Sequence, residues 1–190
     1  MEFDILYWFQ SISNHILDSI MIGFTNLGNG GMLWILLAAI FLCTKKYRKC
    51  GITMTIALLL SLIICNGIMK NLVARPRPCW VDTSVHLLIK NPTDYSFPSG
   101  HTSASFAAAV AIFMYHKKIG IVALIIAANI AISRIYLFVH YPSDVLVSLI
   151  LGCLYGVIAY FAVKALCNRY SKFSEWVSPS LEEKERLIIS

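Results

Sequence analysis

The chain alternates long apolar runs with short polar breaks, and the apolar runs have the length of membrane-spanning helices. These runs cover approximately residues 32–44, 51–73, 99–116, 119–138 and 142–166. A helix of about 20 residues crosses the hydrocarbon core of a bilayer, which is about 30 Å thick. The pattern therefore predicts an all-α integral membrane helical bundle with five transmembrane helices.

The segment from Phe3 to Leu27 has a weaker apolar pattern. Apolar residues recur there at helical spacing, but four polar residues interrupt them: Gln10, Asn14, His15 and Asp18. We predict an N-terminal amphipathic helix that lies in the membrane interface, with a sixth transmembrane helix as the alternative. The stretch "NLGNGG", residues 26–31, breaks this segment before the first span.

Composition and charge agree with a membrane location. Hydrophobic residues make up 58% of the 190 residues and charged residues only 14%, whereas a soluble domain carries about 25% charged residues. The net charge of +6 comes from short basic runs at residues 45–49 and 117–118 and in the tail. Such runs between apolar segments indicate cytoplasmic loops and no nucleic-acid partner. The loops at residues 74–98 and 139–142 are then expected on the outer side.

No polar linker divides the chain, so we predict one membrane-embedded domain over residues 1–190. Residues 1–27 are its interfacial or first helix, and residues 30–166 are its helical core. Residues 167–190, which include "SLEEKER", are a polar cytoplasmic tail that is helical or disordered. The six cysteines match no disulfide framework and no zinc spacing. The sequence makes no prediction about the oligomeric state.

Ionisable residues recur at one depth, near the outer ends of the apolar segments. Lys70 ends the uncharged run of the second segment, and His101 opens the third. Arg134 follows the cytoplasmic edge of the fourth by roughly 22 Å of helix, less than the ~30 Å hydrocarbon core. His140 and Asp144 flank the start of the fifth. Because charges inside a membrane are costly and usually functional, we expect these residues to converge on one site.

The residue types of this site suit a phosphate or diphosphate group. Asp144 is the main anion nearby, and it is outnumbered by four cations: Lys70, Arg75, Arg77 and Arg134. Ser99 and Gly100 stand at a helix start, where free backbone N–H groups favour an anion. No cluster of carboxylates is present for the magnesium ions of a two-metal phosphatase.

The two histidines can supply a nucleophile and an acid. One imidazole can attack phosphorus, and the other can protonate the leaving oxygen. Asp144 comes four residues after His140 and can fix the tautomer and orientation of that ring. His101, which has no close carboxylate in sequence, is then expected to act as the acid and afterwards as the base.

Three motifs in this order resemble those of the type 2 phosphatidic acid phosphatase (PAP2) superfamily. They are K-x6-RP from Lys70 to Pro78, PSGH from Pro98 to His101, and SR-x5-H-x3-D from Ser133 to Asp144. The resemblance covers about residues 70–144.

The resemblance implies a role for each matched residue. His140 would form a phosphohistidine with Asp144 as its partner, and His101 would be the general acid and subsequent base. The phosphate would be bound by Lys70, Arg77, Arg134, Ser99 and the Gly100 backbone. Family members need no metal, so no metal and no other cofactor are expected. Arg75 lies outside the motif, and its role stays open between a second phosphate or headgroup contact and an interface charge.

The resemblance also implies the activity: metal-independent hydrolysis of a lipid phosphate or diphosphate at the outer face of the cytoplasmic membrane. That face agrees with the orientation derived from the basic runs. Undecaprenyl diphosphate is the first candidate substrate, and a phospholipid phosphate such as phosphatidylglycerophosphate is the second. The loop at residues 79–95 is expected to shape headgroup access. The alternatives are a lipid phosphotransferase that uses the same site and an anion transporter, which would leave both histidines without a role.

Overall fold

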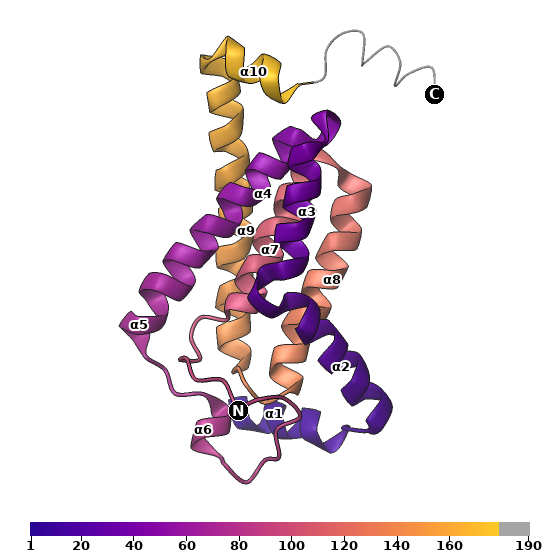
Figure 1. Cartoon of the computed structure of the whole chain (residues 1–190). Coiled ribbons are helices and arrows are strands. Elements are labelled where there is room, and N and C mark those ends of the chain that lie inside the picture. The colour runs from indigo at the N-terminus through magenta and orange to yellow at the C-terminus, as the bar shows by residue number, and fades with distance from the viewer. Residues whose placement is uncertain (179–190) are drawn as a thin grey trace.

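The computed structural model of the chain describes residues 1–178, and every regular element among these residues is helical (Figure 1). The predicted stretch "SLEEKER" lies outside the described residues. The main helices are α1 (Glu2–Ser11), α2 (His15–Gly28), α3 (Met32–Cys43), α4 (Arg48–Leu60), α5 (Lys70–Val73), α6 (Pro78–Val81), α7 (Gly100–Tyr115), α8 (Lys117–Tyr136), α9 (Pro142–Arg169) and α10 (Ser171–Val177). A π-helical segment, Ser61–Met69, joins α4 to α5, and short 3₁₀ turns precede α3 and α4.

Four helical segments are long and apolar enough to cross a membrane: His15–Cys43, Lys45–Val81, Lys117–Tyr136 and Pro142–Arg169. The chain is therefore an all-helical, multi-pass membrane protein. The predicted third span corresponds to α7, which has 16 residues and is shorter than these four. A total of five or six spans stays a prediction.

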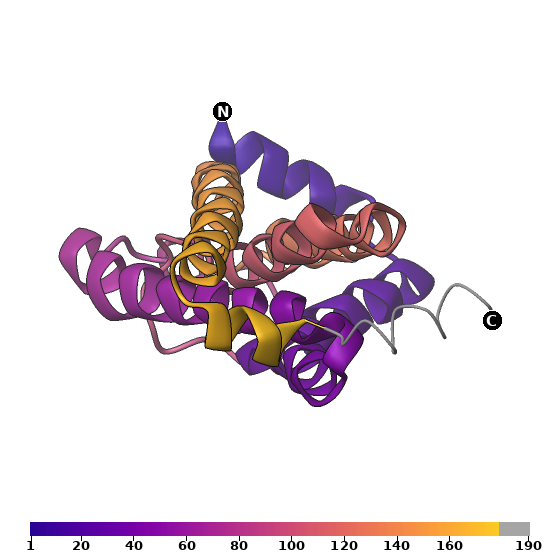
Figure 2. The ribbon, with the colours of Figure 1, turned by 90° about the horizontal axis from the view of Figure 1, so that it is seen from above.

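The N-terminal segment differs from the single amphipathic helix predicted between residues 3 and 27. The Asn14 side chain accepts hydrogen bonds from the backbone N–H groups of Ile16 and Leu17, and this N-cap starts α2 as a separate helix. α1 alone lies across the bundle end, as both views show (Figures 1 and 2). α2 runs on through the turn at residues 29–31 into α3, so the two form one candidate span.

Helix α7 is the central helix, and it packs mainly against α8, α9 and α4. Small side chains let it approach its neighbours closely. A β-carbon on Gly152 of α9 would lie 2.5 Å from the backbone oxygen of Ser103, and one on Gly156 would lie 2.8 Å from that of Ala107. This close contact brings the N-terminus of α7 next to the N-terminus of α9, and the predicted site residues lie there.

Candidate active site

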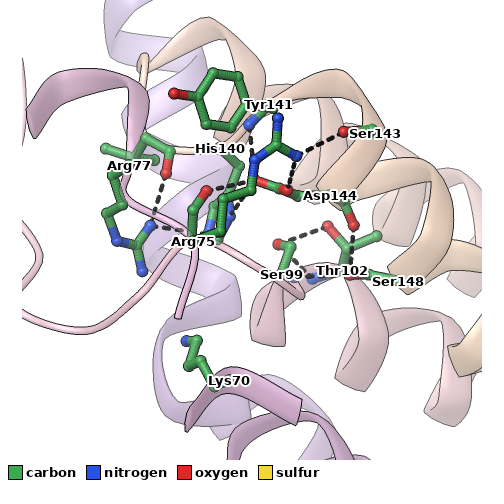
Figure 3. A network of polar contacts seen from close by, with 12 residues as sticks. Lys70, Arg75, Arg77, Ser99, Thr102, His140, Tyr141, Ser143, Asp144 and Ser148 are labelled. Atoms are coloured by element: carbon green, nitrogen blue, oxygen red, sulfur yellow. Dashed lines mark hydrogen bonds and ion pairs between the residues drawn. The ribbon is translucent and has the colours of Figure 1, made fainter. Parts of the chain in front are cut away.

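Six of the eight predicted site residues line one cavity of about 1020 Å³ at the end of the bundle where α7 begins. These six are Lys70, Arg77, Gly100, His101, Arg134 and His140. The other two, Ser99 and Asp144, are fully buried behind its wall (Figure 3). The structure thus brings together residues that are up to 74 positions apart in the chain, from Lys70 to Asp144.

The predicted His140–Asp144 pair lies at the start of α9. His140 Nδ1 is 3.6 Å from Asp144 Oδ2, and both side chains are buried. Asp144 also caps its own helix, because it accepts a 2.9 Å hydrogen bond from the Tyr141 backbone N–H. Ser96 donates a further hydrogen bond to the same carboxylate. The carboxylate is therefore held in one orientation toward the ring.

Arg75 faces this carboxylate and does not line the cavity. Its Nη1 donates to Asp144 Oδ1 at 2.6 Å, and its Nη2 donates to Glu2 Oε2 at 2.6 Å. Its guanidinium also lies 3.8 Å from the centre of the Tyr141 ring. Of the two roles left open for Arg75, the structure shows neither; Arg75 links α1 to the buried Asp144.

The tautomer of His140 follows from its contact with Arg77. Arg77 Nη1 lies 3.0 Å from His140 Nε2. Because a guanidinium can only donate, Nε2 must accept and the ring proton must sit on Nδ1, toward Asp144. Burial lowers the pKa of His140 well below its ordinary value, and the charges of Arg77, Arg134 and Lys70 lower it further. A neutral imidazole with a lone pair on Nε2 is the form that can act as a nucleophile.

We expect the His140 ring to stay neutral at about pH 6, where an ordinary histidine with a pKa of about 6.5 is mostly protonated. The reason is the sign of the shift: a lowered pKa means that the proton binds only at a pH well below 6.5. The ¹⁵N chemical shifts of ¹⁵N-histidine-labelled protein in detergent micelles measure the protonation state. His140→Ala identifies the signal, and a midpoint of protonation at or above pH 6.5 would contradict the expectation.

Two predicted phosphate-binding cations share a counter-ion that the sequence analysis did not identify. Asp94 forms ion pairs with Lys70 Nζ through Oδ2 and with Arg77 Nη2 through Oδ1, the second at 2.6 Å. Burial would raise the pKa of Asp94, but hydrogen bonds and the charges of Lys70 and Arg77 outweigh burial and lower the pKa to about 2. Asp94 is half exposed at the cavity wall, so the carboxylate lies where an incoming anion would meet these cations.

Arg134 is buried at the cavity wall, and its Nε is an unpaired donor. Its Nη1 donates to the hydroxyl of Thr25 on α2, whereas its Nε has no hydrogen-bond partner. Ser99 is engaged in capping α7: its hydroxyl lies 3.0 Å from Thr102 Oγ1, and its backbone N–H donates to Ser148 Oγ at 2.7 Å. The Ser99 hydroxyl can donate to a phosphate while it accepts from the Thr102 hydroxyl.

The stretch "NLGNGG", expected only to break a helix, forms part of the site wall. His101 Nε2 lies 3.0 Å from Asn29 Oδ1, and Asn29 Nδ2 donates to Asn26 Oδ1 at 3.1 Å. With the amide in this orientation, its oxygen faces the ring, so the proton of His101 sits on Nε2. Gly28 is needed beside the ring, because a β-carbon there would lie 2.8 Å from His101 Cδ2. The two histidines thus have opposite tautomers: Nε2 of His140 carries a lone pair, which accepts from Arg77, and Nε2 of His101 carries a proton, which faces Asn29.

Within residues 1–178, no group of three or more His, Cys, Asp and Glu side chains is placed to hold a metal ion. The charged residues at the cavity include the cations Lys70, Arg77 and Arg134, which sit on three different helical or loop segments. Fixed cations of this kind can stabilise the negative charge that develops during phosphoryl transfer.

The chain is also similar in sequence and in overall structure to known proteins. The sequence model described as "PAP2 superfamily" matches residues 50–166. The undecaprenyl-diphosphatase BcrC of Bacillus subtilis is 33% identical over 162 residues, which cover 84% of this chain and 83% of that protein. An undecaprenyl-diphosphatase of Sulfolobus acidocaldarius is 35% identical over 121 residues, 63% of this chain and 58% of that protein. The crystal structure of LpxE from Aquifex aeolicus superimposes with a TM-score of 0.71 at 29% identity, covering 83% of this chain and 93% of that chain.

Proposed function

The chain belongs to the PAP2 superfamily and is a membrane lipid phosphatase, and from that premise we propose that it hydrolyses a lipid diphosphate through a phosphohistidine. His140 Nε2 attacks the terminal phosphorus, and the bond from phosphorus to the leaving oxygen breaks. His101 gives its proton to that oxygen. Lys70, Arg77 and Arg134 bind the phosphoryl oxygens together with Ser99 and the Gly100 backbone, and Asp144 holds the protonated Nδ1 of His140. Water then attacks the phosphohistidine, and His101 takes up the proton.

The observation that carries this mechanism is the pair of opposite tautomers. A nucleophile needs the lone pair that His140 presents, and a general acid needs the proton that His101 holds. Three cations around the same cavity supply the charge that a phosphate requires. No metal and no other cofactor enter this mechanism.

We propose undecaprenyl diphosphate as the first substrate and a phospholipid phosphate such as phosphatidylglycerophosphate as the second. Two relatives with the name undecaprenyl-diphosphatase support this order. The cavity itself supports a lipid, because it continues from the cations along α3 and α4. Its walls there are apolar, with Ile35, Ala38, Leu42, Leu58 and Leu62, and they suit a hydrocarbon chain.

We place the enzyme in the cytoplasmic membrane with its site on the extracellular or periplasmic side. The basic run at residues 45–49 lies in the α3–α4 turn, at the bundle end opposite to α1 and α6 (Figure 1). Basic loops favour the cytoplasmic side of a membrane. The cationic part of the cavity is at the other end, the end across which α1 lies (Figure 1), and the exposed apolar residues Ile5 and Trp8 of α1 suit the outer membrane interface.

Phosphate release from purified protein in detergent tests the proposal. We expect release from undecaprenyl diphosphate in the presence of EDTA, faster than from phosphatidylglycerophosphate and phosphatidic acid. Orthovanadate is expected to compete with the substrate, because it can occupy the same cluster of cations. The proposed function is wrong if none of the three lipids releases phosphate, and a strict requirement for a divalent metal would contradict the metal-independent mechanism.

A further inference from the structure

Unpaired polar atoms mark the cavity and single out one residue that has no assigned role. Within residues 1–178, three buried side-chain N or O atoms have no hydrogen-bond partner: Asn66 Oδ1, Arg134 Nε and His140 Nδ1. All three residues line the same cavity. Because buried polar atoms are nearly always paired, each exception calls for an explanation. Arg134 and His140 belong to the proposed site, and Asn66 is the third member of the set.

Asn66 lies between a proposed phosphate ligand and the start of α7. It belongs to the π-helical segment Ser61–Met69, four residues before Lys70. A β-carbon on Gly100 would come within 2.6 Å of Asn66 Oδ1, so the amide oxygen lies directly against the residue that precedes His101. Single π-helical segments within α-helices often occur at functional sites. The amide is therefore at the proposed phosphoryl site and next to the proposed acid.

The free atom of Asn66 determines what it can bind. A carbonyl oxygen accepts hydrogen bonds only, so its partner must bring an O–H or N–H group. An unprotonated phosphoryl oxygen has no hydrogen to donate and cannot be that partner. A water molecule or an alcohol can donate such a hydrogen bond. Water then still has a second hydrogen to give to a base, whereas an alcohol has only one hydrogen for the two purposes.

We propose that Asn66 is a catalytic residue of the second half-reaction, where its Oδ1 accepts a hydrogen bond from the water that attacks the phosphohistidine. This inference rests on the proposed function. In the step, the water oxygen bonds to phosphorus while the bond from phosphorus to His140 Nε2 breaks and its electron pair returns to the nitrogen. One hydrogen of the water passes to His101. The other stays on the phosphate product, and it is this hydrogen that Asn66 Oδ1 orients.

The two half-reactions place different demands on Asn66. During formation of the phosphohistidine, the leaving oxygen is bonded to the lipid and carries no hydrogen for Asn66 to accept. During its breakdown, the attacking water has two hydrogens and must be fixed in line with the phosphorus. An alcohol has only one hydrogen, which His101 requires, so Asn66 favours water over an alcohol as the acceptor.

The test measures formation and breakdown of the phosphoenzyme separately in Asn66→Ala, with ³²P-labelled lipid diphosphate and rapid quenching. We expect formation within about threefold of the wild type and breakdown slower by roughly 10-fold, because a tenfold loss corresponds to about 1.4 kcal/mol and one hydrogen bond contributes about that much. With glycerol added, we expect the share of phosphate transferred to glycerol to rise at least about fivefold, on the same reasoning.

Two further variants keep the test decisive. Asn71→Ala removes an exposed asparagine of the adjoining helix α5 that does not line the cavity, and it should match the wild type. Asn66→Asp keeps an acceptor oxygen in place, and its phosphoenzyme should break down faster than that of Asn66→Ala. Equal slowing of both steps in Asn66→Ala, or an unchanged ratio of transfer to hydrolysis, overturns the inference. A wild-type enzyme that forms no phosphoenzyme overturns the proposed function and the inference together.

Discussion

His140→Ala is expected to lower phosphate release by about 10⁴-fold or more, the scale on which loss of a covalent nucleophile or its base acts in enzymes of this kind. The reason is geometric. Nε2 of His140 carries a lone pair and no proton, because the Arg77 guanidinium, 3.0 Å away, can only donate to it. Alanine leaves the cations in place but removes the atom that would bond to phosphorus.

The measurement is phosphate release together with trapping of a ³²P-labelled, acid-labile phosphoenzyme. Wild type should give the labelled enzyme, and His140→Ala should give none. His86→Ala is the matched control, because His86 is exposed and lies outside the cavity. Activity of His140→Ala within tenfold of the wild type, or an unchanged amount of labelled enzyme, would show that another residue attacks phosphorus.

His101→Ala is expected to lower turnover of the lipid diphosphate by roughly 10²-fold to 10⁴-fold, the usual contribution of a general acid or base. The expectation follows from the proton on Nε2, which Asn29 Oδ1 fixes at 3.0 Å. Without that proton, the leaving oxygen departs as an anion. Without the base, the later attack of water on the phosphohistidine is slow as well.

A substrate with an activated leaving group separates the two roles of His101. An aryl phosphate needs little help from an acid, so His101→Ala should form the phosphoenzyme from it at close to the wild-type rate. The phosphoenzyme should then accumulate because its breakdown still needs the base. Rapid quenching measures both rates, and the assignment fails if an aryl phosphate phosphorylates the variant as slowly as the lipid does.

The residues that could be predicted from the sequence are those whose chemistry is costly in a membrane. Lys70, Arg134 and His140 stand out in apolar surroundings because ionisable side chains are costly in a membrane and are usually functional there. Their convergence follows from topology, since every one lies near the same end of an apolar segment. The all-helical membrane fold could be predicted from the apolar runs alone, because their lengths match those of membrane-spanning helices.

The site residues that could not be predicted are of types that are ordinary in their sequence surroundings. Asn29 and Gly28 lie in a stretch that is typical of a helix break, and their contact with His101 is made across more than 70 positions. Asp94 lies in a polar loop, where a carboxylate is ordinary. Asn66 stands in an apolar run, but one amide there is usually satisfied by its neighbours. Only the tertiary structure, in which α2 and the π-helical segment pack against α7, shows that these residues share a cavity with the predicted ones.

The N-terminal segment shows a different limit of the pattern. Its mixed polarity predicts one interfacial helix, but Asn14 starts a new helix by capping it, and the second part turns into the bundle. Hydrophobic periodicity identifies a helix better than it identifies where one helix ends and the next begins. The cap was visible in the sequence as an asparagine before an apolar run, a typical N-terminal signal.

The position of Asp94 has a consequence for selectivity. Because its carboxylate already forms ion pairs with Lys70 and Arg77, a substrate phosphate is expected to bind these two cations by ion exchange, replacing one anion with another. In such an exchange, the gain in binding free energy is the difference between the attraction of the cations for the phosphate and their attraction for the carboxylate. The full attraction for the phosphate is not gained. A singly charged headgroup gains little over the resident carboxylate, whereas a terminal phosphate with two charges gains more. The site would then reject abundant phosphodiester lipids of the surrounding membrane by charge alone.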